Sequence, residues 1–334
     1  MTLSRPLSIL LWPASKLYGV GVALRTRLYA HGWRKQKRLK AAVISVGNLS
    51  VGGTGKTPLV IWLAQKLLEQ GHRVAILTRG YRGTAGSSDE VDLMRSRLQN
   101  RVIFGVGKDR FAEGQRIESR QAIDIFLLDD GFQHLQLARD LDIVLMDASR
   151  PVGGQPLLPA GPMREPISAV VRADIIVFTR TENAPGAKEA IQRFWKLPIF
   201  AASTFLLGFR SLGMEGPLQT VADLGSGPFF AFCGIGNPEA FVRDLQRWGV
   251  APVGHMFFAD HHRYTLEDVQ AIERAAKGVG AKGLLTTEKD FCNLTSVALP
   301  ALPVYVSIID LKVDGEIAFL SAIDHLLQAR GAQA

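Results

Sequence analysis

The chain has 334 residues, of which 47% are hydrophobic and 21% are charged. This composition predicts a buried core and excludes wholesale disorder. The two cysteines, Cys233 and Cys292, are too few for a disulfide framework and too far apart for metal-ligand spacing. Their scarcity favours a reducing compartment.

The net charge of +8 is concentrated at the N-terminus, because residues 1–40 contain nine lysines or arginines and no acidic residue. The rest of the chain is therefore close to neutral, which argues against nucleic-acid binding across the main body. The interpretation of the chain as a nucleic-acid-dependent NTPase would rest on this basic segment alone, and no base-stacking motif supports that interpretation. We predict no nucleic-acid partner.

Apolar residues in the same segment recur at helical spacing, from Leu7 to Leu28. The run 7–24 is near the minimum length for crossing a bilayer, but Lys16 lies within it and Pro13 removes a backbone hydrogen bond. We therefore predict that residues 1–40 lie on a membrane as a basic amphipathic segment. The alternative is a surface helix packed on the protein and followed by a solvated tail. No small-residue cleavage site follows the apolar run, which disfavours a signal peptide.

A short apolar run at 41–45 precedes a glycine-rich turn, and a helical pattern with proline in its first turn follows it. This strand, turn and helix form the context of a P-loop, in which backbone N–H groups contact phosphate oxygens. The strict pattern has glycine where this chain has Ser50, but the core of the motif is complete. The residues predicted to bind nucleotide here are Gly52, Gly53, Thr54, Gly55, Lys56 and Thr57, with Thr57 also a magnesium ligand.

A second apolar run at 122–128 ends in Asp129 and Asp130, the arrangement of a Walker B aspartate. One aspartate is expected to hold the metal shell and the other to position a ligand; alternatively, the second is a turn residue. Further strands are predicted at 73–78, 141–146 and 174–179. Strands that alternate with helical patterns predict an α/β fold, a doubly wound parallel sheet of the P-loop NTPase type.

The pattern loosens between about 200 and 228, where glycine and proline interrupt the apolar stretches, and a second α/β pattern begins at residue 229. We therefore predict a P-loop domain at 41–205, a linker at 206–228 and a smaller α/β domain at 229–330.

Eight motifs in order make the chain similar to one known family, the tetraacyldisaccharide 4′-kinases of Gram-negative bacteria. They are GNLSVGGTGKTP at 47–58, TRGY at 78–81, DE at 89–90, DDGFQH at 129–134, RDLDIVLMDA at 139–148, LLPAGPMREP at 157–166, FADHHRY at 258–264 and TTEKD at 286–290.

This resemblance implies a kinase that uses ATP and Mg²⁺ to phosphorylate the 4′-hydroxyl of an acylated glucosamine disaccharide 1-phosphate, giving lipid IVA. It implies a location on the cytoplasmic face of the inner membrane. It assigns Asp89 as the base, assisted by His261, and Asp130 to the catalytic metal region. It also places Arg164 and Glu165 near nucleotide and metal. The predicted metal set is Thr57, Asp129 and Glu165, and Arg110 and Arg164 are predicted beside the nucleotide.

The chemistry of the residues agrees with this assignment. Phosphoryl transfer needs alignment, charge neutralisation and a proton acceptor. The P-loop and nearby arginines supply the first two, and a carboxylate paired with an imidazole supplies the third. Taken alone, a histidine such as His261 is more often a hydrogen-bonded turn residue than a catalyst, and the family resemblance favours the catalytic role. The competing interpretation of the whole chain is a membrane-recruited P-loop ATPase that acts as a switch or assembly factor.

Overall fold

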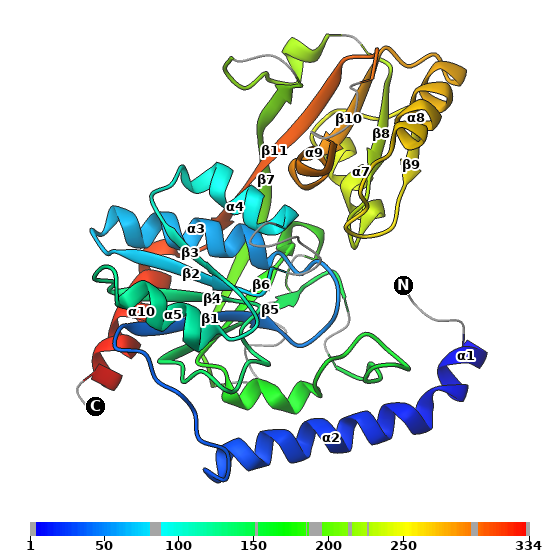
Figure 1. Ribbon diagram of the computed structural model, residues 1–334. Coiled ribbons are helices and arrows are strands. Elements are labelled where there is room, and N and C mark those ends of the chain that lie inside the picture. The colour runs from blue at the N-terminus through cyan, green and yellow to red at the C-terminus, as the bar shows by residue number, and fades with distance from the viewer. Residues whose placement is uncertain are drawn as a thin grey trace. The chain divides into compact units, whose positions relative to one another are not determined.

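A computed structural model describes residues 5–80, 88–150, 153–184, 186, 196–212, 216–225, 227–294 and 300–331. The described residues form two compact units (Figure 1). Unit 1 comprises residues 1–86, 95–204 and 311–334, and unit 2 comprises residues 87–94 and 205–310.

Unit 1 is built on a parallel sheet, as the sequence predicts. Its strand order is β3-β2-β4-β1-β5-β6-β7, so β1 lies between β4 and β5 and the strand order reverses there. Ligands of such sheets bind beyond the carboxyl ends of the strands at this reversal. The strands are β1 (Ala42–Asn48), β2 (Val74–Thr78), β3 (Ile103–Val106), β4 (Ile125–Asp129), β5 (Leu141–Asp147), β6 (Ile175–Thr179) and β7 (Ile199–Ser211).

Helices cover both faces of this sheet. On one face, α3 contributes Trp62, which packs against Phe319 of α10; on the other, Ile117 of α5 joins a core cluster with Phe126 and Leu128. The helical segments of this unit are α1 (Arg5–Leu10), α2 (Trp12–Ala30), α3 (Lys56–Glu69), α5 (Arg110–Glu118), η1 (Ile167–Arg172), η2 (Thr181–Asn183) and α10 (Glu316–Gly331). The predicted α/β fold with a doubly wound parallel sheet is confirmed.

Unit 2 has a smaller parallel arrangement, in which β10 lies between β8 and β11 and β9 is at the edge. Its elements are η3 (Ala222–Leu224), β8 (Phe229–Cys233), α7 (Pro238–Arg247), β9 (Gly254–Phe257), α8 (Leu266–Gly278), β10 (Gly283–Thr287), α9 (Glu288–Leu294) and β11 (Val304–Val313). Helix α8 begins with a capping box between Thr265 and Asp268, and its Val269 and Ile272 pack against Phe230 and Phe232.

Three elements run from one unit into the other along the chain: α4 (Asp89–Leu98), β7 and β11. Residues 206–211, at the start of the predicted linker, continue β7, and Phe209 of that strand forms an antiparallel bridge with Gln219. Gly208, one of the glycines that suggested a linker, therefore lies within a strand, and the other glycines and prolines follow it.

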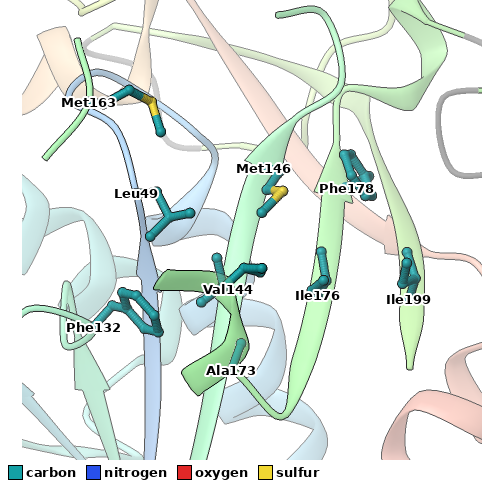
Figure 2. Close-up of a cluster of buried hydrophobic side chains, with 10 residues drawn as sticks. Leu49, Phe132, Val144, Met146, Met163, Ala173, Ile176, Phe178 and Ile199 are labelled. Atoms are coloured by element: carbon teal, nitrogen blue, oxygen red, sulfur yellow. The ribbon is translucent and has the colours of Figure 1, made fainter. Parts of the chain in front are cut away.

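One buried cluster in unit 1 joins the segments that carry the sequence motifs (Figure 2). Leu49 follows β1, Phe132 belongs to the DDGFQH motif, and Met163 belongs to the LLPAGPMREP motif. Each is less than 10% exposed. Burial of these three side chains beside Val144 and Ile176 therefore fixes three separate loops to one end of the sheet.

Phe132 also approaches the backbone of β1 very closely. A Cβ atom added to Gly47 would lie 2.6 Å from the Cβ of Phe132 and 2.7 Å from its backbone nitrogen. Neither neighbour is the end of a flexible side chain, so the backbone itself would have to move. Glycine at position 47 is thus required by packing.

We predict that Gly47→Ala destabilises the protein by about 1–3 kcal/mol because of this clash. Thermal and urea unfolding of the two proteins measure the change. Gly21→Ala is the matched control, since no heavy atom lies within 4 Å of a Cβ at that helical position. Equal stability of Gly47→Ala and the unsubstituted protein would contradict the packing argument.

Candidate active site

The glycine turn after β1 has the backbone conformation of a phosphate-binding loop. Gly52 has φ of 104° and Gly55 has φ of 80°, values that other residues rarely adopt, and Gly55 caps the N-terminus of α3. Thr54 is buried within the turn, where its hydroxyl accepts a hydrogen bond from Asn48 at 2.8 Å and its carbonyl accepts one from Thr179 at 2.9 Å. Residues that end β1 and β6, the strands on either side of β5, therefore fix the loop.

Ser50, the position where the motif departs from the strict pattern, lies in an extended segment. It forms an antiparallel bridge with Met163, and the flanking hydrogen bonds run from Val51 N to Pro162 O (2.8 Å) and from Arg164 N to Leu49 O (2.7 Å). An extended residue needs no positive φ, so serine is tolerated where the strict motif has glycine. The bridge also joins the LLPAGPMREP segment to the glycine turn.

Asp129 and Asp130 lie at the carboxyl end of β4. The side chain of Asp129 is buried and accepts a hydrogen bond from the Thr78 hydroxyl at 3.1 Å. Asp130 has a left-handed backbone with φ of 49° and pairs with Lys56 at 3.4 Å and with Arg164 at 2.8 Å. Burial alone would raise the pKa of Asp130, but the charges of Lys56 and Arg164 lower it below its usual value. Asp130 therefore stays ionised beside the loop lysine.

Glu165 is held by two partners instead of pointing freely into the site. Its Oε1 accepts a hydrogen bond from Gln133 at 3.0 Å, and its Oε2 pairs with Arg172 at 2.6 Å. Gln133 also donates to the carbonyl of Asn48 at the end of β1. Glu165 thus ties the DDGFQH motif to the LLPAGPMREP motif, and its assignment as a metal ligand stays a prediction.

Additional cations surround the glycine turn. Arg110 is 7% exposed and lies close enough to Asp129 and Asp130 for their charges to act on it; burial, with the nearby Arg79, lowers its pKa. Arg150 and Arg180, which the sequence analysis missed, both pair with buried Asp147, at 3.4 and 3.2 Å. Cβ atoms at Gly52 and Gly53 would lie 3.5 and 4.0 Å from these two guanidiniums. The sequence feature that could have pointed to these two arginines is the polar residue that ends each nearby strand, Asp147 in β5 and Thr179 in β6.

The residues in this part of unit 1 fit a magnesium ion bound together with a nucleotide. Mg²⁺ prefers oxygen ligands and is commonly held by one or two carboxylates, with substrate phosphates and water completing the shell. Asp129, Asp130 and the hydroxyl of Thr57 are oxygen donors of this kind. Among the described residues, no group of three or more His, Cys, Asp and Glu side chains could hold a metal ion without other ligands.

Asp89 and His261 form a pair in unit 2, although 172 positions separate them in the sequence. Asp89 begins α4, where the helix dipole favours a carboxylate, and its Oδ2 lies 2.8 Å from His261 Nδ1. His261 has a left-handed backbone with φ of 61°, and its N–H donates to the carbonyl of Gly234 at 3.1 Å. Their side chains are 6% and 17% exposed, so the pair is largely shielded from water.

The two groups shift each other's pKa in opposite directions. Burial alone would raise the pKa of Asp89, but the hydrogen bond from His261 and the charge of Lys289 outweigh it and lower this pKa. The hydrogen bond to Asp89 raises the pKa of His261 against burial and the charge of Lys289. Asp89 is therefore ionised at neutral pH and accepts the Nδ1 hydrogen, and the pair can take up one more proton whenever the imidazole is neutral.

The structure thus brings the predicted residues together in two groups. Unit 1 combines the glycine turn, Lys56, Asp130 and Arg164 through direct contacts, and unit 2 combines Asp89 with His261. A phosphate-binding turn at a helix N-terminus, next to aspartates at the end of a parallel strand, defines the class of P-loop nucleotide-binding proteins.

Comparisons with known proteins identify the family within this class. A sequence model of the tetraacyldisaccharide-1-P 4′-kinase family matches residues 7–328. The chain is 37% identical to the tetraacyldisaccharide 4′-kinases of Geobacter sulfurreducens and Geobacter metallireducens, over 96% and 97% of its own length and 93% and 100% of theirs. The chain therefore belongs to the tetraacyldisaccharide-1-P 4′-kinase family, and the predicted family and enzyme class are confirmed.

A solved structure agrees with this membership. The structure of LpxK from Aquifex aeolicus in complex with ATP superposes with a TM-score of 0.77 at 31% sequence identity, covering 96% of this chain and 99% of that one. The interpretation of the chain as a switch or assembly ATPase is not favoured, because relatives of this similarity are named as kinases.

Proposed function

We propose that this protein transfers the γ-phosphoryl group of ATP to the 4′-hydroxyl of a tetraacylated glucosamine disaccharide 1-phosphate, a step of lipid A biosynthesis. Family membership supports the substrates. The single structural observation that carries the proposal is the coexistence of a phosphate-binding turn, with Lys56 paired to Asp130, and a shielded carboxylate–imidazole pair able to accept a hydroxyl proton.

In the proposed reaction the hydroxyl oxygen bonds to the γ-phosphorus, the bridging P–O bond to the β-phosphate breaks, and ADP leaves. Backbone N–H groups of Gly53–Thr57 and the Lys56 ammonium bind the phosphates. Arg164 and Arg110 offset negative charge near Asp130. The proton of the hydroxyl passes to the Asp89–His261 pair. When bound through Thr57, Asp129 and Asp130, Mg²⁺ supplies further neutralisation of phosphate charge.

We predict that labelled ATP and magnesium transfer label to tetraacyldisaccharide 1-phosphate presented in detergent micelles. Thin-layer chromatography of the lipid separates the product from unreacted acceptor. An unlabelled lipid, together with nucleotide hydrolysis that responds to some other molecule, would instead support the switch ATPase.

We further predict that Asp89→Ala and His261→Ala each lower kcat by at least about a hundredfold, because the proton acceptor is lost. Calorimetric titration should show that both variants still bind ATP, since the phosphate-binding turn belongs to unit 1. His255→Ala is the control, because this histidine is exposed on β9 of the same unit. Near-normal turnover of both variants would remove the pair from the mechanism.

The N-terminal segment supports a second part of the proposal, association with the membrane that contains the acceptor. Among the described residues, no helix combines the length and apolar character that a membrane crossing needs. Three polar side chains of the segment face the protein: Ser8, Ser15 and Tyr18 donate hydrogen bonds to the backbone carbonyls of Ala160, Leu157 and Arg164, at 2.8–3.0 Å.

Several apolar side chains of the same segment are exposed instead. Leu17, Val20 and Leu24 of α2 are 74, 65 and 57% exposed, and Leu10 at the end of α1 is 75% exposed. The exposed side of helix α2 therefore combines these apolar side chains with the basic residues Lys16, Arg25 and Arg27. We propose that this apolar stripe lies in the membrane surface while the basic residues contact anionic headgroups on its cytoplasmic face.

We predict that the triple variant Leu17→Gln, Val20→Gln, Leu24→Gln loses binding to phosphatidylglycerol-containing vesicles by at least about tenfold, because each apolar side chain contributes about 1.5–3 kcal/mol when buried. Co-sedimentation measures binding, and activity on micellar acceptor should persist. The control is Ile317→Gln, an apolar residue of α10 that is 84% exposed. Unchanged sedimentation of the triple variant would show that the stripe is not the anchor.

A further inference from the structure

Lys289 lies at the centre of a charged cluster in unit 2 for which the proposed reaction has no role so far. Its Nζ is 3.7 Å from carboxylate oxygens of Asp89, Glu90 and Asp260, and 3.4 Å from Nε2 of His261. The side chain is 21% exposed, so solvent screens these interactions only in part. Three carboxylates already surround this ammonium group, which argues against a role as a receptor for an anionic substrate.

The position of Lys289 relative to His261 is fixed by its neighbour Asp290. Asp290 is 1% exposed, and its Oδ1 accepts hydrogen bonds from Gly234 N at 2.7 Å and from the Tyr264 hydroxyl at 2.8 Å. Gly234 in turn accepts the backbone hydrogen bond of His261. The start of α9 and the turn that carries His261 are therefore tied to one buried carboxylate, which holds the backbone of Lys289 near that of His261.

The two ring nitrogens of His261 have different charged partners. An ionised carboxylate only accepts hydrogen bonds, so Nδ1 must carry the hydrogen shared with Asp89. A lysine ammonium only donates, so its contact at 3.4 Å favours an unprotonated Nε2, whereas the Asp260 carboxylate, 3.8 Å from the same nitrogen, favours a protonated one. Asp89 therefore holds the hydrogen on Nδ1, and Lys289 opposes Asp260 at Nε2, where a further proton would bind.

We propose that Lys289 is a positioning residue of the Asp89–His261 pair, whose ammonium group keeps the pair in the form that accepts the proton of the acceptor hydroxyl. This inference rests on the proposed function of the pair. Lys289 acts through both partners: it stabilises the carboxylate of Asp89 at 3.7 Å, and it opposes a second proton on His261 from 3.4 Å.

The direction of the electrostatic effects agrees with this role. The charge of Lys289 lowers the pKa of Asp89 and also lowers that of His261, while Asp89 and Asp260 act on His261 in the opposite direction. Loss of the ammonium would therefore raise both values. Without Lys289, the pair would therefore become protonated at a higher pH than in the unsubstituted protein.

The test compares Lys289→Met with Lys289→Arg, which restores the positive charge, and with Lys277→Met, which removes an exposed lysine of α8. We expect the acidic limb of the kcat/KM profile for the acceptor to move up by about half a pH unit or more in Lys289→Met. The limb should return to its original place in Lys289→Arg and stay unmoved in Lys277→Met. The KM for ATP should be unchanged in every variant.

A second readout follows His261 directly in the absence of substrate. In protein with ¹⁵N-labelled histidine, His261→Gln identifies the His261 ring signals, and their midpoint should rise in Lys289→Met by a shift similar to that of the activity limb. A uniform loss of activity at every pH, with the His261 midpoint unmoved, would overturn the proposal. A raised midpoint in a protein that never phosphorylates the glycolipid would refute the proposed function but leave the placement of Lys289 intact.

Discussion

The contact of Phe132 with the backbone of β1 is the constraint on which the phosphate-binding half of this protein depends. Because Gly47 has no side chain, Phe132 can lie directly against the strand, and the chain that follows β4 turns back over the end of the sheet. This places Asp130 beside Lys56 and Gln133 beside Asn48. The guanidinium of Arg172 covers the outer surface of the same ring at 4.3 Å. One aromatic side chain thus connects packing with electrostatics.

Unit 2 uses a buried polar group for the same purpose. Burial raises the pKa of Asp290, while its hydrogen bonds with Thr287, Gly234 and Tyr264 act to lower it. A buried carboxylate with this many donors joins segments that are distant in sequence, since removing it would leave several polar groups unsatisfied. Here those segments are the ends of β8 and β10 and the turn that carries His261. The left-handed backbone of His261 is held by this network.

The sequence predicted well those parts of the protein that local chemistry determines. The glycine turn, the aspartates that end β4 and the parallel sheet all follow from patterns within short windows, and the structure has them where they were expected. Ser50 seemed a departure from the motif, but it belongs to a bridge with Met163 that only the folded chain reveals. Arg150 and Arg180 were missed because no local motif marks them; their proximity to the glycine turn arises from the order of strands β5 and β6.

The Asp89–His261 pair shows the limit of reasoning from spacing. No periodic pattern relates residues that are 172 positions apart, and each lies in a polar stretch that would pass for a capped helix start or a turn. The resemblance to a known family assigned both residues to the proton acceptor. The contact between them is seen only in the structure. Lys289 was harder still, because its role depends on contacts with two other segments and not on its own neighbours in the sequence.

The N-terminal segment depends both on a local sequence pattern and on contacts that only the folded chain makes. Its apolar residues predicted an amphipathic helix, but the sequence could not tell whether the apolar stripe would cover the protein or remain outside. Hydrogen bonds from Ser15 and Tyr18 to the segment 157–164 turn that side of the helix toward the protein, and Leu17 and Leu24 are exposed. That segment carries Arg164, which pairs with Asp130. Helix α2, whose exposed side we propose contacts lipid, is therefore hydrogen-bonded directly to Arg164. The side chain of Arg164 in turn neutralises charge beside the phosphate-binding turn.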